Sequence, residues 1–199
     1  LDADDIILSE TTEALLNILE TNTDLVLVYG LQRKVKNLND INIFENFDER
    51  NYTVIHNPIK KAMRNSMFNP SQFLARTELC KKVGGCDERI KFSQEYSLTL
   101  KLSILGKFAK LNFPTAILPF VAPGQISEKK NNQIYRVSKA LELFLEDNPK
   151  LESKYKLYAQ RRLTARAWRF AKRFKKSSFF SEWFLLYLKG FFYFNSNVL

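Results

Sequence analysis

The sequence predicts an α/β domain followed by a helical C-terminal segment. Short apolar runs alternate with amphipathic helical patterns over about the first 150 residues, which is typical of α/β domains. The run Leu25–Gly30 is the clearest strand, because it is apolar, rich in β-branched residues and stopped by glycine. From Lys154 onward the pattern is instead helical, basic and aromatic.

Capping and turn residues delimit the other expected elements. Ser9 and Ser93 are candidate N-caps. The first precedes a helix that reaches about Asn22, and the second a helix that reaches about Leu105. The polar residues 31–50 predict a surface excursion. Further strands are expected at 52–56, 72–76, 108–111 and 116–120, and further helices after Pro58, at 77–83 up to Gly84-Gly85, and at 131–146 before Asn148-Pro149.

Positive charge is concentrated in the last quarter of the chain. The net charge is +10, and residues 151–199 hold eleven Lys and Arg against two Glu. The tail therefore favours an anionic surface, whereas the rest of the chain is nearly neutral. A hydrophobic content of 45% excludes wholesale disorder, and two cysteines exclude a disulfide framework. A bridge between Cys80 and Cys86 is geometrically possible, but two reduced thiols are expected in a cytosolic protein. No apolar run reaches the roughly 18 residues of a membrane-spanning helix.

Three carboxylates follow what resembles the end of a strand at Leu1. Asp2, Asp4 and Asp5 would repel one another in a cleft, so they would need a cation there. Oxygen ligands suit Mg²⁺ or Mn²⁺, and such an ion neutralises the charge of a departing diphosphate. The alternative interpretation is a solvated acidic turn that precedes a helix.

A further acidic residue opens the helix expected at residue 94. Glu95 follows the turn Gly84-Gly85-Cys86-Asp87-Glu88 and lies in the first turn of its helix. The positive end of the helix dipole keeps such a carboxylate ionised and able to accept a proton. The alternative interpretation is a glutamate at a helix start with no chemical role.

Together, these segments resemble the second half of an inverting family 2 glycosyltransferase, which has a GT-A fold. The matching segments are LDADD at 1–5, FLARTELCKKVGGCDERI at 73–90 and QEYSLTLKLSILGK at 94–107. The resemblance covers roughly residues 1–127 and implies a partial GT-A domain, with a Rossmann-like mixed sheet flanked by helices. We expect the N-terminal nucleotide-binding half to be missing before Leu1, and residues 128–199 to form a basic, aromatic helical extension.

The resemblance also implies roles for the acidic residues. Asp2 would contact the nucleotide ribose and, with Asp4, the Mg²⁺ or Mn²⁺ ion, while Asp5 would lie nearby. Glu95 falls where the family has its catalytic base, although the helix opens with Gln94-Glu95 rather than Glu-Asp.

The activity implied is metal-assisted, inverting transfer of a sugar from a nucleotide-sugar donor such as a UDP-sugar. The acceptor would be a glycan or a lipid-linked molecule in cell-surface polysaccharide or lipopolysaccharide synthesis. Two alternatives stay open. One is a non-catalytic glycosyltransferase-like binding protein, and the other is a basic protein that binds membrane surfaces.

The tail combines a basic helical stripe with many aromatic residues. Arg162, Arg166, Arg169, Arg173 and Lys176 recur every three or four residues, and an aromatic stretch follows at 179–194. Cations beside aromatic rings suit a membrane interface, so we expect residues 160–199 to contact anionic lipid at the inner face of the cell membrane, with the protein otherwise cytoplasmic. The alternative is a helix pair that packs its aromatic side chains on the body. No nucleic-acid partner is expected, because no recognised module accompanies the charge.

Overall fold

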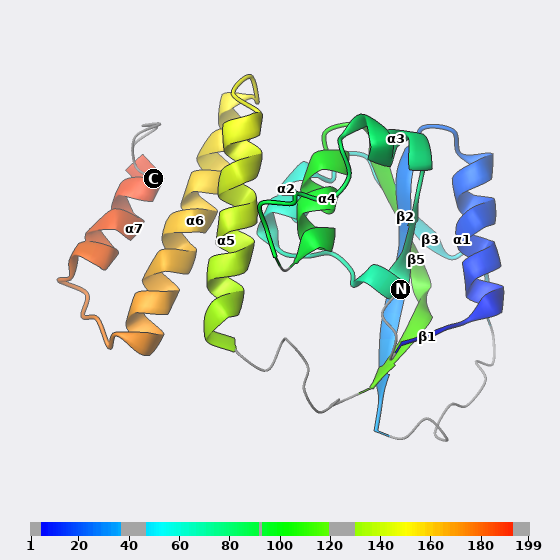
Figure 1. Ribbon diagram of the computed structural model, residues 1–199, viewed down its shortest axis with the longest axis horizontal. Helices are drawn as coiled ribbons and strands as arrows, with labels where there is room; N and C mark the ends of the chain where they lie inside the picture. The colour runs from blue at the N-terminus through cyan, green and yellow to red at the C-terminus, as the bar shows by residue number, and fades with distance from the viewer. Residues whose placement is uncertain (1–4, 37–46, 92, 120–129, 193–199) are drawn as a thin grey trace.

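An open mixed sheet flanked by helices forms the body of this α/β protein (Figure 1). The computed structural model describes residues 5–36, 47–91, 93–119 and 130–192. The strands described are β1 (Ile6–Ile7), β2 (Leu25–Val35), β3 (Tyr52–Ile55), β4 (Phe73–Ala75) and β5 (Lys107–Pro119). The helices described are α1 (Ser9–Thr21), α2 (Ile59–Arg64), the 3₁₀ turn η2 (Pro70–Gln72), α3 (Thr77–Lys82), α4 (Gln94–Leu102), α5 (Lys130–Asp147), α6 (Ser153–Phe174) and α7 (Glu182–Phe192).

The two long strands, β2 and β5, are parallel and form the centre of the sheet. β4 runs antiparallel along the other edge of β2. β1 and β3 both pair antiparallel with β5, β3 near its start and β1 near its end. Both therefore lie along the edge of β5 that β2 does not occupy.

Helices cover both faces of the sheet, and a helical layer extends from one side (Figure 1). α1 buries Leu15 and Ile18 against one sheet face, in contact with Val28 and Leu111. On the opposite face α4 contributes a buried leucine, Leu102. α5 and α6 then share a further core with α2 and α4, and α7 packs on α6. None of the described helices is both long enough and apolar enough to cross a bilayer.

Most of the expected elements are present, but two sheet predictions were wrong. Residues 108–111 and 116–120 were expected to form two strands, whereas β5 is continuous to Pro119. The chain tolerates Pro114 because it pairs with Leu31 at a register shift between β2 and β5, and a bulge accommodates a residue without an N–H group. β2 also continues to Val35, into the segment expected to be a polar excursion.

Both predicted serine caps differ from the structure. α1 begins at Ser9 itself, and Leu8 occupies the N-cap position, where its carbonyl accepts hydrogen bonds from the Thr11 and Thr12 hydroxyls. Ser93 does precede α4, but its backbone is left-handed, with φ 60° and ψ 40°, and its side chain makes no capping hydrogen bond. A left-handed serine is strained, because its Cβ crowds the backbone.

Candidate functional site

Asp5 lies immediately before β1, and the 3₁₀ turn η2 holds its carboxylate. The Ser71 hydroxyl donates to Asp5 Oδ2 at 2.6 Å, and Ser71 itself is buried. The next residue, Gln72, donates from its amide to the Gly30 carbonyl of β2 at 3.1 Å. η2 thus connects the acidic N-terminal segment to the central strand. Asp2 and Asp4 lie outside the described residues.

A cleft of about 580 Å³ opens beside η2, between β2 and the segment that follows α2. Its wall is polar and aromatic: Asn69 donates to the Gln32 side chain at 2.5 Å, and the Tyr29 and Phe68 rings meet at 5.0 Å. Burial raises the pKa of Tyr29 to about 12, so its phenol stays protonated near neutral pH. Lys61 and Lys110 add two cationic side chains to the lining.

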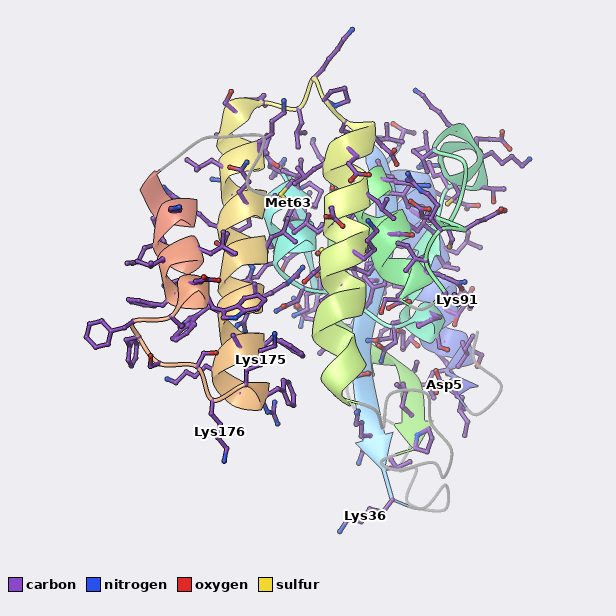
Figure 2. The ribbon with its side chains drawn as sticks, turned by 60° about the vertical axis from the view of Figure 1, so that its left-hand side comes forward. Asp5, Lys36, Met63, Lys91, Lys175 and Lys176 are labelled. Carbon is purple, nitrogen blue, oxygen red and sulfur yellow. The ribbon has the colours of Figure 1, made fainter. Side chains whose placement is uncertain are left out.

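Glu95 occupies the first turn of α4, as the sequence predicts. Its backbone carbonyl accepts a hydrogen bond from the Thr99 hydroxyl at 2.6 Å. The pKa of the nearby Cys86 thiol is raised, mainly by partial burial and then by the negative charge of the Glu95 carboxylate. Figure 2 shows Lys91, four residues before Glu95, on the same side of the molecule as Asp5 and away from α7.

The loop before α4 has a structural role that its acidic motif did not reveal. Asp87 is 7% exposed, and the Arg89 guanidinium donates to its carboxylate at 2.9 and 2.7 Å. The same guanidinium also pairs with Asp147 at the end of α5. Arg89 therefore connects the loop to the helical layer. Its hydrogen bonds to the Asp87 carboxylate, followed by its charge, hold the pKa of Asp87 below its usual value.

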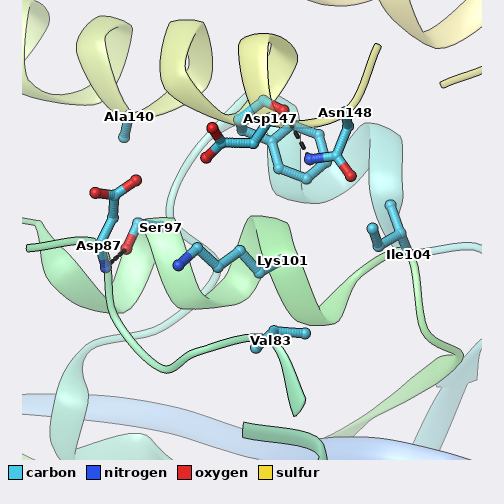
Figure 3. A pocket seen from close by; sticks show the side chains of 9 residues that line it. Val83, Asp87, Ser97, Lys101, Ile104, Ala140, Asp147 and Asn148 are labelled. Atoms are coloured by element: carbon cyan, nitrogen blue, oxygen red, sulfur yellow. Dashed lines mark hydrogen bonds between the residues drawn. The ribbon is translucent and has the colours of Figure 1, made fainter. Parts of the chain in front are cut away.

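A small pocket of about 250 Å³ lies at this junction, between α4 and α5 (Figure 3). The Asp87 backbone N–H donates to the Ser97 hydroxyl at 3.0 Å, and Lys101 donates to the Gly85 carbonyl at 3.1 Å. Because Arg89 neutralises both carboxylates of the pocket, we interpret it as a packing junction. Gly84 and Gly85 both adopt positive φ, which explains the glycine pair that ends α3.

Arg76, the last residue of the FLAR segment, holds the backbone of two elements. Its guanidinium donates to the carbonyl of Leu25 at 2.8 Å and to that of Asn22 at 3.2 Å. These contacts fix the end of α1 against the start of β2. We therefore assign the Arg76 side chain a structural role. Cys80 and Cys86 are both free, as expected.

The predicted basic stripe of α6 does not face solvent along its whole length. Arg166 is only 4% exposed, and it donates to the carbonyls of Val137, Met63 and Arg64 at 2.9, 3.4 and 3.2 Å and to the Tyr96 hydroxyl at 3.3 Å. Arg162 donates to Arg64 O at 2.7 Å, and desolvation, followed by the charge of Arg166, lowers its pKa. The three- and four-residue spacing of these cations correctly placed them on one face of α6. The structure shows that α2 and α5 cover part of that face.

The described residues contain no cluster of three His, Cys, Asp or Glu side chains arranged to hold a metal ion. Of the three aspartates predicted at the metal and nucleotide site, Asp2, Asp4 and Asp5, only Asp5 belongs to that part of the chain. Its carboxylate is an oxygen donor of the type that Mg²⁺ and Mn²⁺ prefer. No model of a known protein family matches the sequence, and the search of curated proteins found no match.

Proposed function

We propose that this protein is a glycosyltransferase of the family 2 type, which transfers a sugar from a nucleotide-sugar donor to a glycan or lipid-linked acceptor. The position of Glu95 carries the proposal. Glu95 opens α4 two residues after Ser93, whose backbone is left-handed, in a segment that resembles the acceptor side of these enzymes. Strained backbone persists only where its surroundings hold it, and it clusters at functional sites.

In this proposal Glu95 is the general base. It takes the proton from an acceptor hydroxyl as that oxygen attacks the anomeric carbon of the donor. The new carbon–oxygen bond forms as the bond to the nucleoside diphosphate breaks, and the electron pair leaves with the diphosphate. Attack from the opposite side inverts the configuration at that carbon.

The acidic segment would serve the donor. Asp2 and Asp4 would hold Mg²⁺ or Mn²⁺, with Asp2 also at the ribose of a UDP-sugar, and Asp5 would line the same site. When bound, the cation would neutralise charge on the departing diphosphate. Ser71 donates to Asp5 and so fixes the direction of that carboxylate.

The cleft beside η2 suits the acceptor. The side-chain amides of Gln32 and Asn69 line this cleft and can pair with sugar hydroxyls. Lys61 and Lys110 give this cleft the positive charge that the phosphate of a lipid-linked acceptor requires. Nucleotide sugars and such acceptors meet at the cytoplasmic side of the membrane, so we propose that the protein works there in cell-surface polysaccharide or lipopolysaccharide synthesis.

The test is release of nucleoside diphosphate from a panel of nucleotide sugars by the intact protein, with Mn²⁺ and lipid-linked acceptors. Glu95→Gln should lower turnover by about a hundredfold or more, because a general base contributes at least that much. Asp4→Ala should abolish turnover. Glu20→Gln is the matched control, because Glu20 is an exposed acid on α1, outside the three segments that carry the resemblance, and it should leave the rate unchanged.

Two results would overturn the proposal. Full activity of Glu95→Gln would remove this residue from the mechanism. Mn²⁺-dependent binding of a nucleotide without any turnover would favour a non-catalytic binding protein with a glycosyltransferase-like fold.

A further inference from the structure

α7 presents a row of apolar side chains to solvent. Leu185, Leu188 and Phe191 recur every three residues and are 53%, 36% and 41% exposed. In the preceding turn, Phe179 is 58% exposed and Phe180 is 94% exposed. We call these five residues the apolar rim. Exposed aromatic and leucine side chains gathered on one element indicate a contact surface.

The apolar rim stands on a well-packed support. The ring of Phe179 packs against Trp168 of α6 at 5.6 Å and against Phe184 of α7 at 5.2 Å. α6 and α7 also approach closely, since a Cβ added at Gly190 would lie 2.3 Å from the Thr164 hydroxyl. One side of α7 is therefore fixed on α6. The Arg161 guanidinium of α6 lies 5.4 Å from the centre of the Phe191 ring, so Phe179 and Phe191 border this packing, and all five residues of the apolar rim stay at least partly exposed beside it.

Positive charge surrounds the apolar rim. Lys172, Arg173, Lys175 and Lys176 at the end of α6 are exposed, as is Lys189 on α7. The Lys175 ammonium lies 4.7 Å from the centre of the Trp183 ring, and the Lys172 ammonium lies 5.4 Å from that of Phe179. Figure 2 shows Lys175 and Lys176 together at one end of α6, where the chain turns toward α7. Glu182 is the single acid in residues 172–191.

We propose that the apolar rim and these lysines dock the protein on an anionic lipid surface. Rings and leucines would enter the boundary between headgroups and acyl chains, while the cations bind the headgroups. A second copy of this face would bring like charges together, which disfavours self-association. A nucleic-acid groove would satisfy the lysines but leave the leucines without an apolar partner. This inference goes beyond the proposed function and does not depend on it.

The docking surface differs from the basic stripe that the sequence suggested. Arg166 is committed to the core and Arg162 to the Arg64 carbonyl, so these two cations do not point to lipid. The proposed lipid contact lies instead at the far end of α6, in the turn between α6 and α7, and on α7. The proposal therefore predicts effects at Phe180 and Lys176.

Vesicle flotation of the full chain tests the proposal. The protein should float with vesicles of phosphatidylglycerol and phosphatidylcholine in equal parts, and far less with phosphatidylcholine alone. Lys175→Ala with Lys176→Ala should weaken binding about 25-fold, since each cation near an anionic surface contributes about fivefold. Phe180→Ser should weaken it about tenfold, because it removes one large apolar side chain from the lipid boundary.

Matched controls separate docking from general stickiness. Leu16→Ser changes a 45% exposed leucine on α1, and Lys82→Ala with Lys150→Ala removes two exposed lysines elsewhere. Both control proteins should float like the wild type. Phe180 and Lys176 are both exposed, and circular dichroism verifies that each variant folds.

Several outcomes would overturn the proposal. Equal flotation with neutral vesicles would show that charge is irrelevant, and equal loss in the control variants would show that the surface is not specific. If light scattering finds a dimer that Phe180→Ser converts to a monomer, a second copy covers this face instead. Tight binding to double-stranded DNA that the lysine variants abolish and Phe180→Ser leaves intact would identify a nucleic-acid surface.

Discussion

Replacing Arg166, whose guanidinium is buried, tests how the helical layer is joined to the α/β body. Its hydrogen bonds reach Met63 and Arg64 of α2, Tyr96 of α4 and Val137 of α5, so one side chain of α6 contacts three other helices. Arg169, one turn further on, is exposed. Replacing each by alanine compares a buried arginine with a solvated one on the same helix.

The expected cost follows from what the truncation leaves behind. The Met63 carbonyl still accepts from the Tyr96 hydroxyl at 3.1 Å, and Arg64 O still accepts from Arg162. These two carbonyl oxygens therefore keep a hydrogen-bond donor after the truncation. The loss of stability comes from the removed hydrogen bonds of the charged guanidinium and from the cavity that the missing side chain leaves. We expect Arg166→Ala to lower the free energy of unfolding by about 3 kcal/mol, and Arg169→Ala to change it by less than about 0.5 kcal/mol.

Unfolding in urea and by heat measures the effect. A loss of this size corresponds to a fall in Tm of about 6–12 °C for a chain of this length. The two tryptophans, Trp168 and Trp183, lie on α6 and α7, so their fluorescence reports the helical layer, while far-ultraviolet circular dichroism reports the whole chain. Both signals should shift together. A loss below about 1 kcal/mol, or a shift in fluorescence alone, would refute the role assigned to Arg166.

Three further predictions concern single residues of the body. A Cβ at Gly30 would lie 2.1 Å from Thr115 Cγ2, so Gly30→Ala should lower stability by about 2 kcal/mol in thermal unfolding, and an unchanged Tm would contradict this packing. Because Arg89 lowers the pKa of Asp87, the ion pair stabilises the fold above about pH 4 and loses this contribution as the pH falls further. Urea unfolding between about pH 5 and pH 3 should therefore show a smaller decline for Asp87→Asn than for the wild type, and equal declines would argue against the pair. Ser93→Gly should raise the free energy of unfolding by about 0.5 kcal/mol, because glycine adopts a left-handed backbone without strain, and a loss of stability in the same assay would contradict this.

Local patterns sufficed where one short segment determines its own structure. The apolar run at 25–30 lies within β2, the glycine pair at 84 and 85 ends α3, and Glu95 stands in the first turn of α4. Each follows from hydrophobic period, glycine conformation or capping, which act over a few residues. The roles of Asp2, Asp4 and Glu95 in catalysis stay predictions from resemblance.

Partners distant in the chain could not be predicted in this way. The sequence places Arg89 two residues after Asp87, but nothing local indicates that it reaches Asp147, 58 residues away. Similarly, Pro114 alone predicts a break between two strands. The structure shows one strand, because a register shift in its pairing with β2 accommodates the proline. Ser93 resembles an ordinary cap, although its left-handed backbone prevents that role.

The sequence by itself determined the α/β alternation, the position of Glu95 at a helix start and the concentration of charge in the tail, because these depend on residue order alone. The tertiary structure decided which cations of the tail are buried and which are exposed. Arg166 and Lys176 belong to one helical stripe in the sequence, but α2 and α5 cover only the first. Burial depends on which elements pack together, so only the folded chain could distinguish the core arginine from the lysines proposed to bind lipid.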